Sequence, residues 1–121
     1  MTELSAPLSA EDRKLVTLAR ATRARTGAVE GAAVRDENGR TYAAGAVDLP
    51  SLQLSALEVC VAMALASGSR GLEAAVVLTE ASAPVAGLTA VADLAGPAVT
   101  VHVADHAGRG LRSGTAGAPP A

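Results

Sequence analysis

Apolar and polar positions between residues 9 and 27 repeat with the period of an α-helix. Leu15, Leu18 and Ala19 follow one another at helical spacing, while Arg and Lys residues occupy the opposite side. Ser9 is typical of a helix N-cap, and the acidic residues that follow it suit the first turn. We expect this helix to end at Gly27, because glycine readily adopts the left-handed conformation found there.

Two short apolar runs, residues 31–35 and 40–47, flank a turn. The turn reads Asp36-Glu37-Asn38-Gly39, and Asn-Gly favours the positive φ angles that a tight hairpin needs. The pattern therefore predicts a β-hairpin. We expect Leu49-Pro50-Ser51 to break the second strand.

The most apolar segments lie in the middle of the chain. Residues 55–67 predict a helix that is apolar nearly all round, which is typical of a helix that packs on more than one side. Residues 72–79 are a continuous apolar run, as expected of a central strand buried on both faces. A short helix over residues 89–94, ended by Gly96-Pro97, and a strand over residues 99–104 complete the pattern.

The predicted order of elements is α-β-β-α-β-α-β, with a weak last strand near residues 110–112. This order gives a mixed sheet of four to five strands with helices packed on it, an α/β fold. We expect residues 1–8 to be a flexible start and residues 9–112 to form one domain. Residues 113–121 are rich in Gly, Ala and Pro, which predicts a disordered tail.

The composition narrows the classes of function. Half of the 121 residues are hydrophobic but Tyr42 is the only aromatic, so the core is built of small side chains and oligomerisation is favoured. The net charge of −2 and the lack of stacking aromatics argue against nucleic-acid binding. Residues 59–66, the longest apolar stretch, are too few to cross a membrane. With no signal pattern at the start, we expect a cytoplasmic protein.

Few side chains suggest independent chemistry. Cys60 is a lone cysteine on the apolar helix, expected to be a small buried hydrophobe rather than a nucleophile. His102 in a strand and His106 in the next turn are expected at surface or edge positions rather than at a metal. Gly108 and Gly110 lack the strand-loop-helix context of a phosphate loop. We expect no G-x-S-x-G elbow and no Ser-His-Asp arrangement.

Several stretches match one family. Gly31-Ala32-Ala33-Val34 resembles a V-G-A-A strand, Gly45-Ala46-Val47-Asp48 resembles G-x-N-V-E, and Pro84-Val85-Ala86-Gly87-Leu88 falls at P-C-x-x-C. The helix near Ser55 falls at a C-A-E helix. These motifs, in this order, resemble those of the cytidine deaminases over residues 12–112. The resemblance implies a three-layer α/β/α fold.

The resemblance also implies a zinc site, which this sequence lacks. In that family one His or Cys and two Cys hold zinc, and a Glu two residues past the first ligand moves protons. Aligned without gaps, the first ligand falls on Leu57, the Glu on Val59, and the two Cys on Val85 and Leu88. None of these side chains has a lone pair to offer a metal, so we expect zinc to be absent.

Glu58 has two interpretations. One gap aligns Ala56-Leu57-Glu58 with C-A-E, which keeps Glu58 as the acid but places Ala56 at the ligand position. Alternatively, Ser55 and Glu58 form a capping box at the start of the helix.

The substrate-binding positions of the family are also altered. The ribose-contacting N-x-E falls on Ala46 and Asp48, and the base-stacking aromatic falls on Ala28. Asp48 is therefore the remaining candidate ligand-binding residue. We expect Leu57, Val85 and Leu88 to pack together as core in place of the metal.

Three functions follow from the resemblance. The first is a non-catalytic, homodimeric or homotetrameric structural or interaction module, which assembles through its central helices as the family does. The second is a nucleoside-binding regulatory protein. The third is a cytidine deaminase-type hydrolase with a non-standard site built from Glu58, Asp48 and His102.

Overall fold

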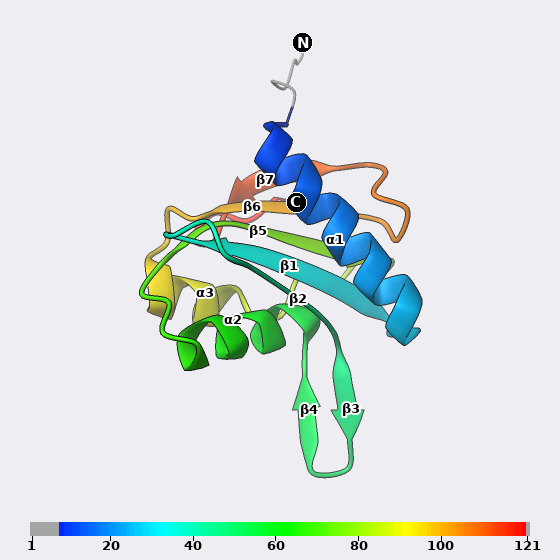
Figure 1. Ribbon diagram of the computed structural model, residues 1–121. Helices are drawn as coiled ribbons and strands as arrows, with labels where there is room; N and C mark the ends of the chain where they lie inside the picture. The colour runs from blue at the N-terminus through cyan, green and yellow to red at the C-terminus, as the bar shows by residue number, and fades with distance from the viewer. Residues whose placement is uncertain (1–7, 121) are drawn as a thin grey trace.

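A five-stranded mixed sheet forms the centre of the computed structural model, which describes residues 8–120 (Figure 1). Its strands are β1 Glu30–Asp36, β2 Thr41–Gly45, β5 Leu72–Thr79, β6 Thr100–Ala104 and β7 Arg112–Thr115. They lie in the order β2-β1-β5-β6-β7, in which only β5 and β6 are parallel. Helix α1 (Ala10–Thr26) covers one face, and α2 (Ala56–Ala66) and α3 (Leu88–Ala95) cover the other. The predicted three-layer α/β/α fold is confirmed.

Helix α1 begins and ends where the sequence predicts. Ser9 is its N-cap and accepts a hydrogen bond from the Asp12 N–H at 3.1 Å, and Gly27 ends it at a φ of 68°. Leu15 and Ala19 are fully buried and pack with Ala33, Val76 and other residues of the sheet. Most of the charged residues of α1, among them Lys14, Arg20 and Arg25, are exposed.

The β1–β2 turn is built around the Asp36 side chain. The Gly39 N–H donates to the Asp36 carbonyl, and Gly39 has a φ of 82°. Asp36 Oδ1 also accepts from the N–H groups of Asn38 and Arg40, while the Ser69 hydroxyl donates to Oδ2 at 2.6 Å. The Ser69 hydrogen bond, more than the opposing effect of burial, holds the pKa of the Asp36 carboxyl below its ordinary value.

The predicted second strand, residues 40–47, is too long. β2 ends at Gly45, and the chain continues as a separate hairpin of β3 (Val47–Leu49) and β4 (Leu52–Leu54) that projects from the sheet (Figure 1). Pro50 and Ser51 form its turn. Proline suits a turn as well as a strand end, which is why the sequence suggested a break here instead of a hairpin.

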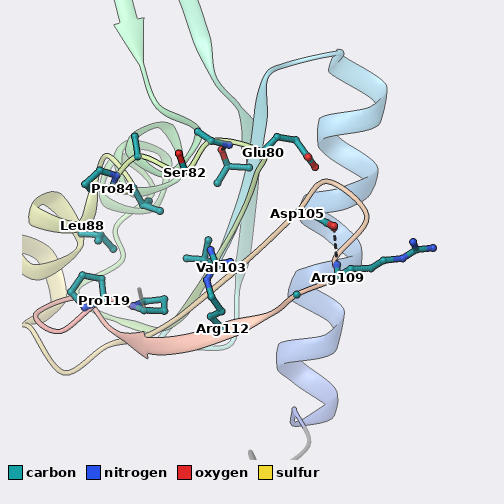
Figure 2. Close-up of a pocket in the computed structure, with 15 residues that line it drawn as sticks. Glu80, Ser82, Pro84, Leu88, Val103, Asp105, Arg109, Arg112 and Pro119 are labelled. Atoms are coloured by element: carbon teal, nitrogen blue, oxygen red, sulfur yellow. Dashed lines mark hydrogen bonds between the residues drawn. The ribbon is translucent and has the colours of Figure 1, made fainter.

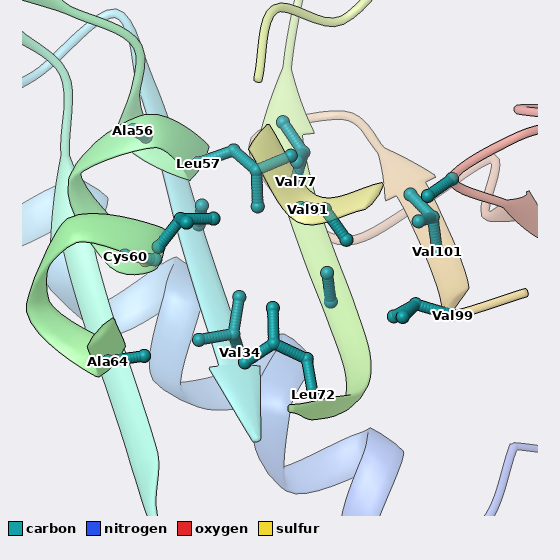
Figure 3. Close-up of a cluster of buried hydrophobic side chains, with 14 of the residues drawn as sticks. Val34, Ala56, Leu57, Cys60, Ala64, Leu72, Val77, Val91, Val99 and Val101 are labelled. Atoms are coloured by element: carbon teal, nitrogen blue, oxygen red, sulfur yellow. The ribbon is translucent and has the colours of Figure 1, made fainter. Parts of the chain in front are cut away.

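The largest apolar cluster lies between the sheet and helices α2 and α3. It is built of Val, Ala and Leu, with Leu57 pointing from α2 toward Val77 on β5 and Val91 on α3 (Figure 3). The predicted central strand matches β5 at both ends, and the predicted apolar helix is α2 with Ser55 as its N-cap. Tyr42 packs against this cluster and is only partly buried.

The expected disordered tail, residues 113–121, needs correction. Residues 112–115 form β7, antiparallel to β6, and the N–H groups of Ala116 and Gly117 donate to the carbonyls of Val99 and Pro97. The composition suggested disorder, but β6 offers an edge that these residues pair with. The expected flexible start lies almost wholly outside the described residues. Among residues 8–120, none of the helices combines the length and apolar composition that a membrane crossing requires.

Candidate functional site

The N-termini of α2 and α3 meet on one side of the sheet. Gly87, the N-cap of α3, has a φ of 106°. A Cβ at this position would lie 3.1 Å from Leu57 Cβ and 3.2 Å from the Glu58 nitrogen. The Ser55 hydroxyl donates to the Ala86 carbonyl at 3.0 Å. Direct protein contacts therefore join the two helix starts.

Glu58 has a structural role at this junction. The Glu58 N–H donates to Ser55 Oγ at 3.1 Å, and Glu58 Oε1 accepts from the Ser55 N–H at 2.8 Å. The capping-box interpretation is confirmed. Glu30 adds a second carboxylate, which accepts from the Ala56 N–H at 3.3 Å. The sequence analysis missed Glu30, because only the packing of β1 against α2 brings it to the helix start.

Hydrocarbon occupies the four positions of the expected zinc chemistry. Leu57 is fully buried, and Val59, Val85 and Leu88 are partly buried against the same cluster. Within residues 8–120, no group of three His, Cys, Asp or Glu side chains is placed to hold a metal ion. The zinc that the resemblance implies therefore does not fit the donor set at this junction.

A cavity of about 750 Å³ lies beside the junction (Figure 2). Val85 and Leu88 line it on the α3 side, and it reaches the ends of the parallel strands β5 and β6. Figure 2 shows Arg112 beside Val103, with the Arg109 side chain extending away from the other lining residues. The carboxyl ends of parallel strands are common places for ligand sites, a signal that would have located this cavity from the sequence.

The cavity lining carries both signs of charge. Glu80 and Asp105 contribute carboxylates, and Arg109 and Arg112 contribute guanidinium groups. Asp105 Oδ1 is occupied by the N–H groups of Ala107 and Arg109, at 2.9 and 2.8 Å. Glu80 accepts from the His106 N–H at 2.9 Å. With its carboxylates bonded to backbone, the cavity suits recognition of a polar molecule through Arg112.

The structure does not bring Asp48 into this cavity. Asp48 lies exposed on β3, where its Oδ1 accepts from Gln53 Nε2 at 3.3 Å, and it is not among the lining residues. Ala46, at the other ribose position, donates its N–H to the Glu30 carbonyl at 3.3 Å.

Cys60 is buried, as the sequence predicts. Its thiol is fully buried and lies 3.6 Å from the Tyr42 carbonyl oxygen. Burial raises the pKa of the Cys60 thiol to about 12. The thiolate, which is the nucleophilic form, is therefore scarce at neutral pH.

The prediction that His102 occupies a surface or edge position is wrong. His102 is buried with 4% exposure, and its ring nitrogens lie 2.7 Å from Ser113 Oγ and 2.8 Å from Asp12 Oδ2. The expectation of no Ser-His-Asp arrangement is also wrong. Asp12, His102 and Ser113 come from α1, β6 and β7, and no local sequence motif predicts that these three elements bring them together. His106, in contrast, is partly exposed and donates from Nε2 to the Val29 carbonyl at 2.9 Å.

Asp12 is held from a second side by Arg35. Arg35 Nη1 lies 3.0 Å from Asp12 Oδ1, and Arg35 Nε donates a hydrogen bond to Glu73 Oε1 at 2.8 Å. Burial raises the pKa of the Asp12 carboxyl, but the hydrogen bonds and charges of His102 and Arg35 outweigh it and bring this pKa below its ordinary value. Asp12 is therefore ionised at neutral pH.

The mixed sheet, with two helices that start against each other on one face, defines a cytidine deaminase-like α/β protein. The family model described as "Cytidine deaminase-like" matches residues 8–108. The chain belongs to this family.

Solved structures agree with the family in fold. Cytidine deaminase from Burkholderia pseudomallei is 22% identical and superposes with a TM-score of 0.76 over 91% of this chain and 94% of that one. Cytidine deaminase from Mycobacterium leprae is 18% identical, with a TM-score of 0.66 over 89% and 95% of the two chains. At these identities the likeness shows the fold alone. No curated protein sequence matches the chain.

Proposed function

We propose that this protein is a cytoplasmic, zinc-free member of its family that does not deaminate nucleosides and acts as a homo-oligomeric structural or interaction module. One observation carries the first part. Leu57, Val59, Val85 and Leu88 contribute hydrocarbon to one apolar cluster, where zinc-dependent deamination needs lone-pair donors. The junction is also narrow at Gly87, where an added Cβ would lie only 3.1 Å from Leu57 Cβ.

The outer side of α2 supports assembly with a second copy. Ala62, Leu65 and Ala66 are exposed there, Leu65 to 60%, and α2 has no charged residue after Glu58. A charge-free helix face gains most by packing on another apolar face, and a second copy supplies an identical one. The small side chains of the core also leave a lone protomer with little buried area per residue.

Metal content and turnover test the first part. Protein expressed with added zinc is purified without chelator, its zinc is measured by elemental analysis, and release of ammonia from cytidine is followed. We expect substoichiometric zinc and no turnover above buffer. Stoichiometric zinc together with cytidine turnover would overturn the proposal.

Light scattering and sedimentation test the assembly. We expect a dimer or tetramer that Leu65→Glu converts to smaller species. Ala24→Glu, which adds the same charge at an exposed position of α1, is the matched control and leaves the mass unchanged. A monomeric mass for the unaltered chain at high micromolar concentration would refute the proposed assembly.

The cavity favours nucleoside binding as a second candidate function. Its volume of about 750 Å³ lies within the usual range of small-molecule sites. A thermal-shift series with nucleosides and nucleotides tests it, since a bound ligand raises Tm with its concentration. Arg112→Ala should abolish the shift. An unchanged Tm for every compound would contradict this function.

A further inference from the structure

Ser113, His102 and Asp12 form a continuous hydrogen-bonded chain on the α1 side of the sheet. Ser113 Oγ lies 2.7 Å from His102 Nδ1, and His102 Nε2 lies 2.8 Å from Asp12 Oδ2. These distances fall within the reach required of a nucleophile, a general base and the group that orients the base. The β6–β7 register places His102 directly opposite Ser113.

Neighbouring charged side chains decide which atoms donate and which accept in the Ser113–His102–Asp12 series. Arg35 pairs with Asp12 at 3.0 Å and is itself held by Glu73 at 2.8 Å. An ionised Asp12 can only accept a hydrogen bond, so His102 Nε2–H is the donor to it. The Nδ1 nitrogen then carries the lone pair and accepts a hydrogen bond from the Ser113 hydroxyl. The pair Asp12 and Arg35 therefore prepares His102 to act as a base.

Ser113 is exposed, whereas His102 is buried and Asp12 is partly buried. Ser113 lies on the edge strand β7. The Ala116 N–H donates inward to Val99, and the Thr115 N–H donates outward to Ala118. Successive N–H groups of an antiparallel strand point alternately toward and away from the neighbouring strand. The N–H of Ser113, two residues before Thr115, therefore also points away from β6. In acyl transfer, the backbone N–H of the nucleophile's own residue is one of the donors that stabilise the oxyanion, and an outward N–H at Ser113 is free of the β6 ladder for this role.

We propose that Ser113 is an acyl-accepting nucleophile, with His102 as its general base and Asp12 as a positioning residue, and that its substrates are carboxylic esters with good leaving groups. This site lies across the sheet from the junction of α2 and α3. It is therefore independent of the absent deaminase chemistry, and either proposal can fail without the other.

The proposed reaction balances without a cofactor. Ser113 Oγ bonds to the ester carbonyl carbon while its proton passes to His102 Nδ1. The carbon–oxygen bond to the leaving alcohol breaks, and the alcohol takes that proton. Water then attacks the acyl-serine with His102 again as base, which releases the carboxylic acid and restores the serine. The sum is one ester and one water converted to one acid and one alcohol.

A fluorophosphonate probe and p-nitrophenyl acetate test the proposal on the full chain. We expect mass spectrometry to find the phosphonyl label on Ser113, and nitrophenol release to fall to the buffer rate in Ser113→Ala. Ser67→Ala and Ser51→Ala remove other exposed serines and should leave both readouts unchanged. Labelling spread evenly over exposed serines, or full activity in Ser113→Ala, would overturn the proposal.

Asp12 variants separate catalysis from a purely structural hydrogen-bond network. In a serine protease, the corresponding Asp-to-Asn change lowers kcat about 10,000-fold because the histidine adopts the wrong tautomer. We expect Asp12→Asn to slow labelling of Ser113 at least about 10-fold with circular dichroism unchanged, and Asp12→Glu to restore part of the rate. A fall in Tm with an unchanged labelling rate would show that the network is only structural and would refute the proposal.

Discussion

Replacing Leu57 with alanine tests whether hydrocarbon at the start of α2 stabilises this protein in place of a metal. The Leu57 side chain is fully buried and points toward Val77 and Val91 (Figure 3). Loss of its buried isopropyl group costs about 2 kcal/mol in transfer free energy. The cavity left behind raises the expected loss to about 3 kcal/mol, since the surrounding side chains relax only in part.

Urea unfolding followed by circular dichroism measures this loss as a lower midpoint at an unchanged slope. For a chain of 121 residues, about 3 kcal/mol corresponds to a fall in Tm of about 12 °C.

Leu65→Ala is the matched control, because it makes the same change on the same helix at a residue that is 60% exposed. We expect its effect to stay within about 0.5 kcal/mol. Both variants are compared at dilutions where light scattering shows a monomer, because Leu65 also belongs to the proposed contact surface. Equal losses in the two variants would refute the idea that the junction is a packed core.

Three further predictions concern other parts of the molecule. Asp36 has a folded-state pKa below its ordinary 3.8, so the stability that its carboxylate contributes is present above pH 3.8 and is lost as pH falls through the folded-state pKa. The difference in unfolding free energy between the unaltered chain and Asp36→Asn should therefore shrink in acid, and a difference that does not change with pH would contradict this. Native Cys60 should resist iodoacetamide and react only in denaturant, since it is buried with a pKa of about 12; rapid alkylation of the native protein would refute this. Gly114→Val should release the C-terminal residues to proteases, because a Cβ at Gly114 would lie 2.6 Å from the Ala118 carbonyl oxygen. Gly71→Val is the control, because a Cβ there would meet nothing nearer than Glu37 Cβ at 4.0 Å, and equal cleavage of the two variants would contradict the contact.

The elements that the sequence predicts best are those with local signals. β5 was predicted to the residue because a run that is apolar apart from Glu73 and Thr79 admits few alternatives, and α1 and α2 were marked by the caps Ser9 and Ser55. The β3–β4 hairpin was missed because Pro50 is compatible with both a strand end and a turn. β7 was misplaced because its composition resembles that of a disordered tail.

The candidate site was predictable only where it depends on residue type. The sequence alone shows that Leu57, Val85 and Leu88, the positions that the resemblance aligns with zinc ligands, carry only hydrocarbon. The meeting of Asp12 and His102, 90 residues apart, depends on how α1 crosses the sheet, and no periodicity encodes that crossing. The sequence therefore indicates which residue types occupy an expected site more readily than which contacts form between distant residues.

The hydrogen bonds of His102 link the first turn of α1 to the last strand of the sheet. During synthesis, a nascent chain holds Asp12 long before the ribosome has added Ser113. The contact between Asp12 and His102 therefore waits until β6 has been made, although Asp12 can pair with Arg35 earlier, and contacts of such wide sequence separation form slowly. A chain that stops short of β7 would leave His102 without its Ser113 partner and the edge of β6 unpaired, an exposed edge of the kind that chaperones bind.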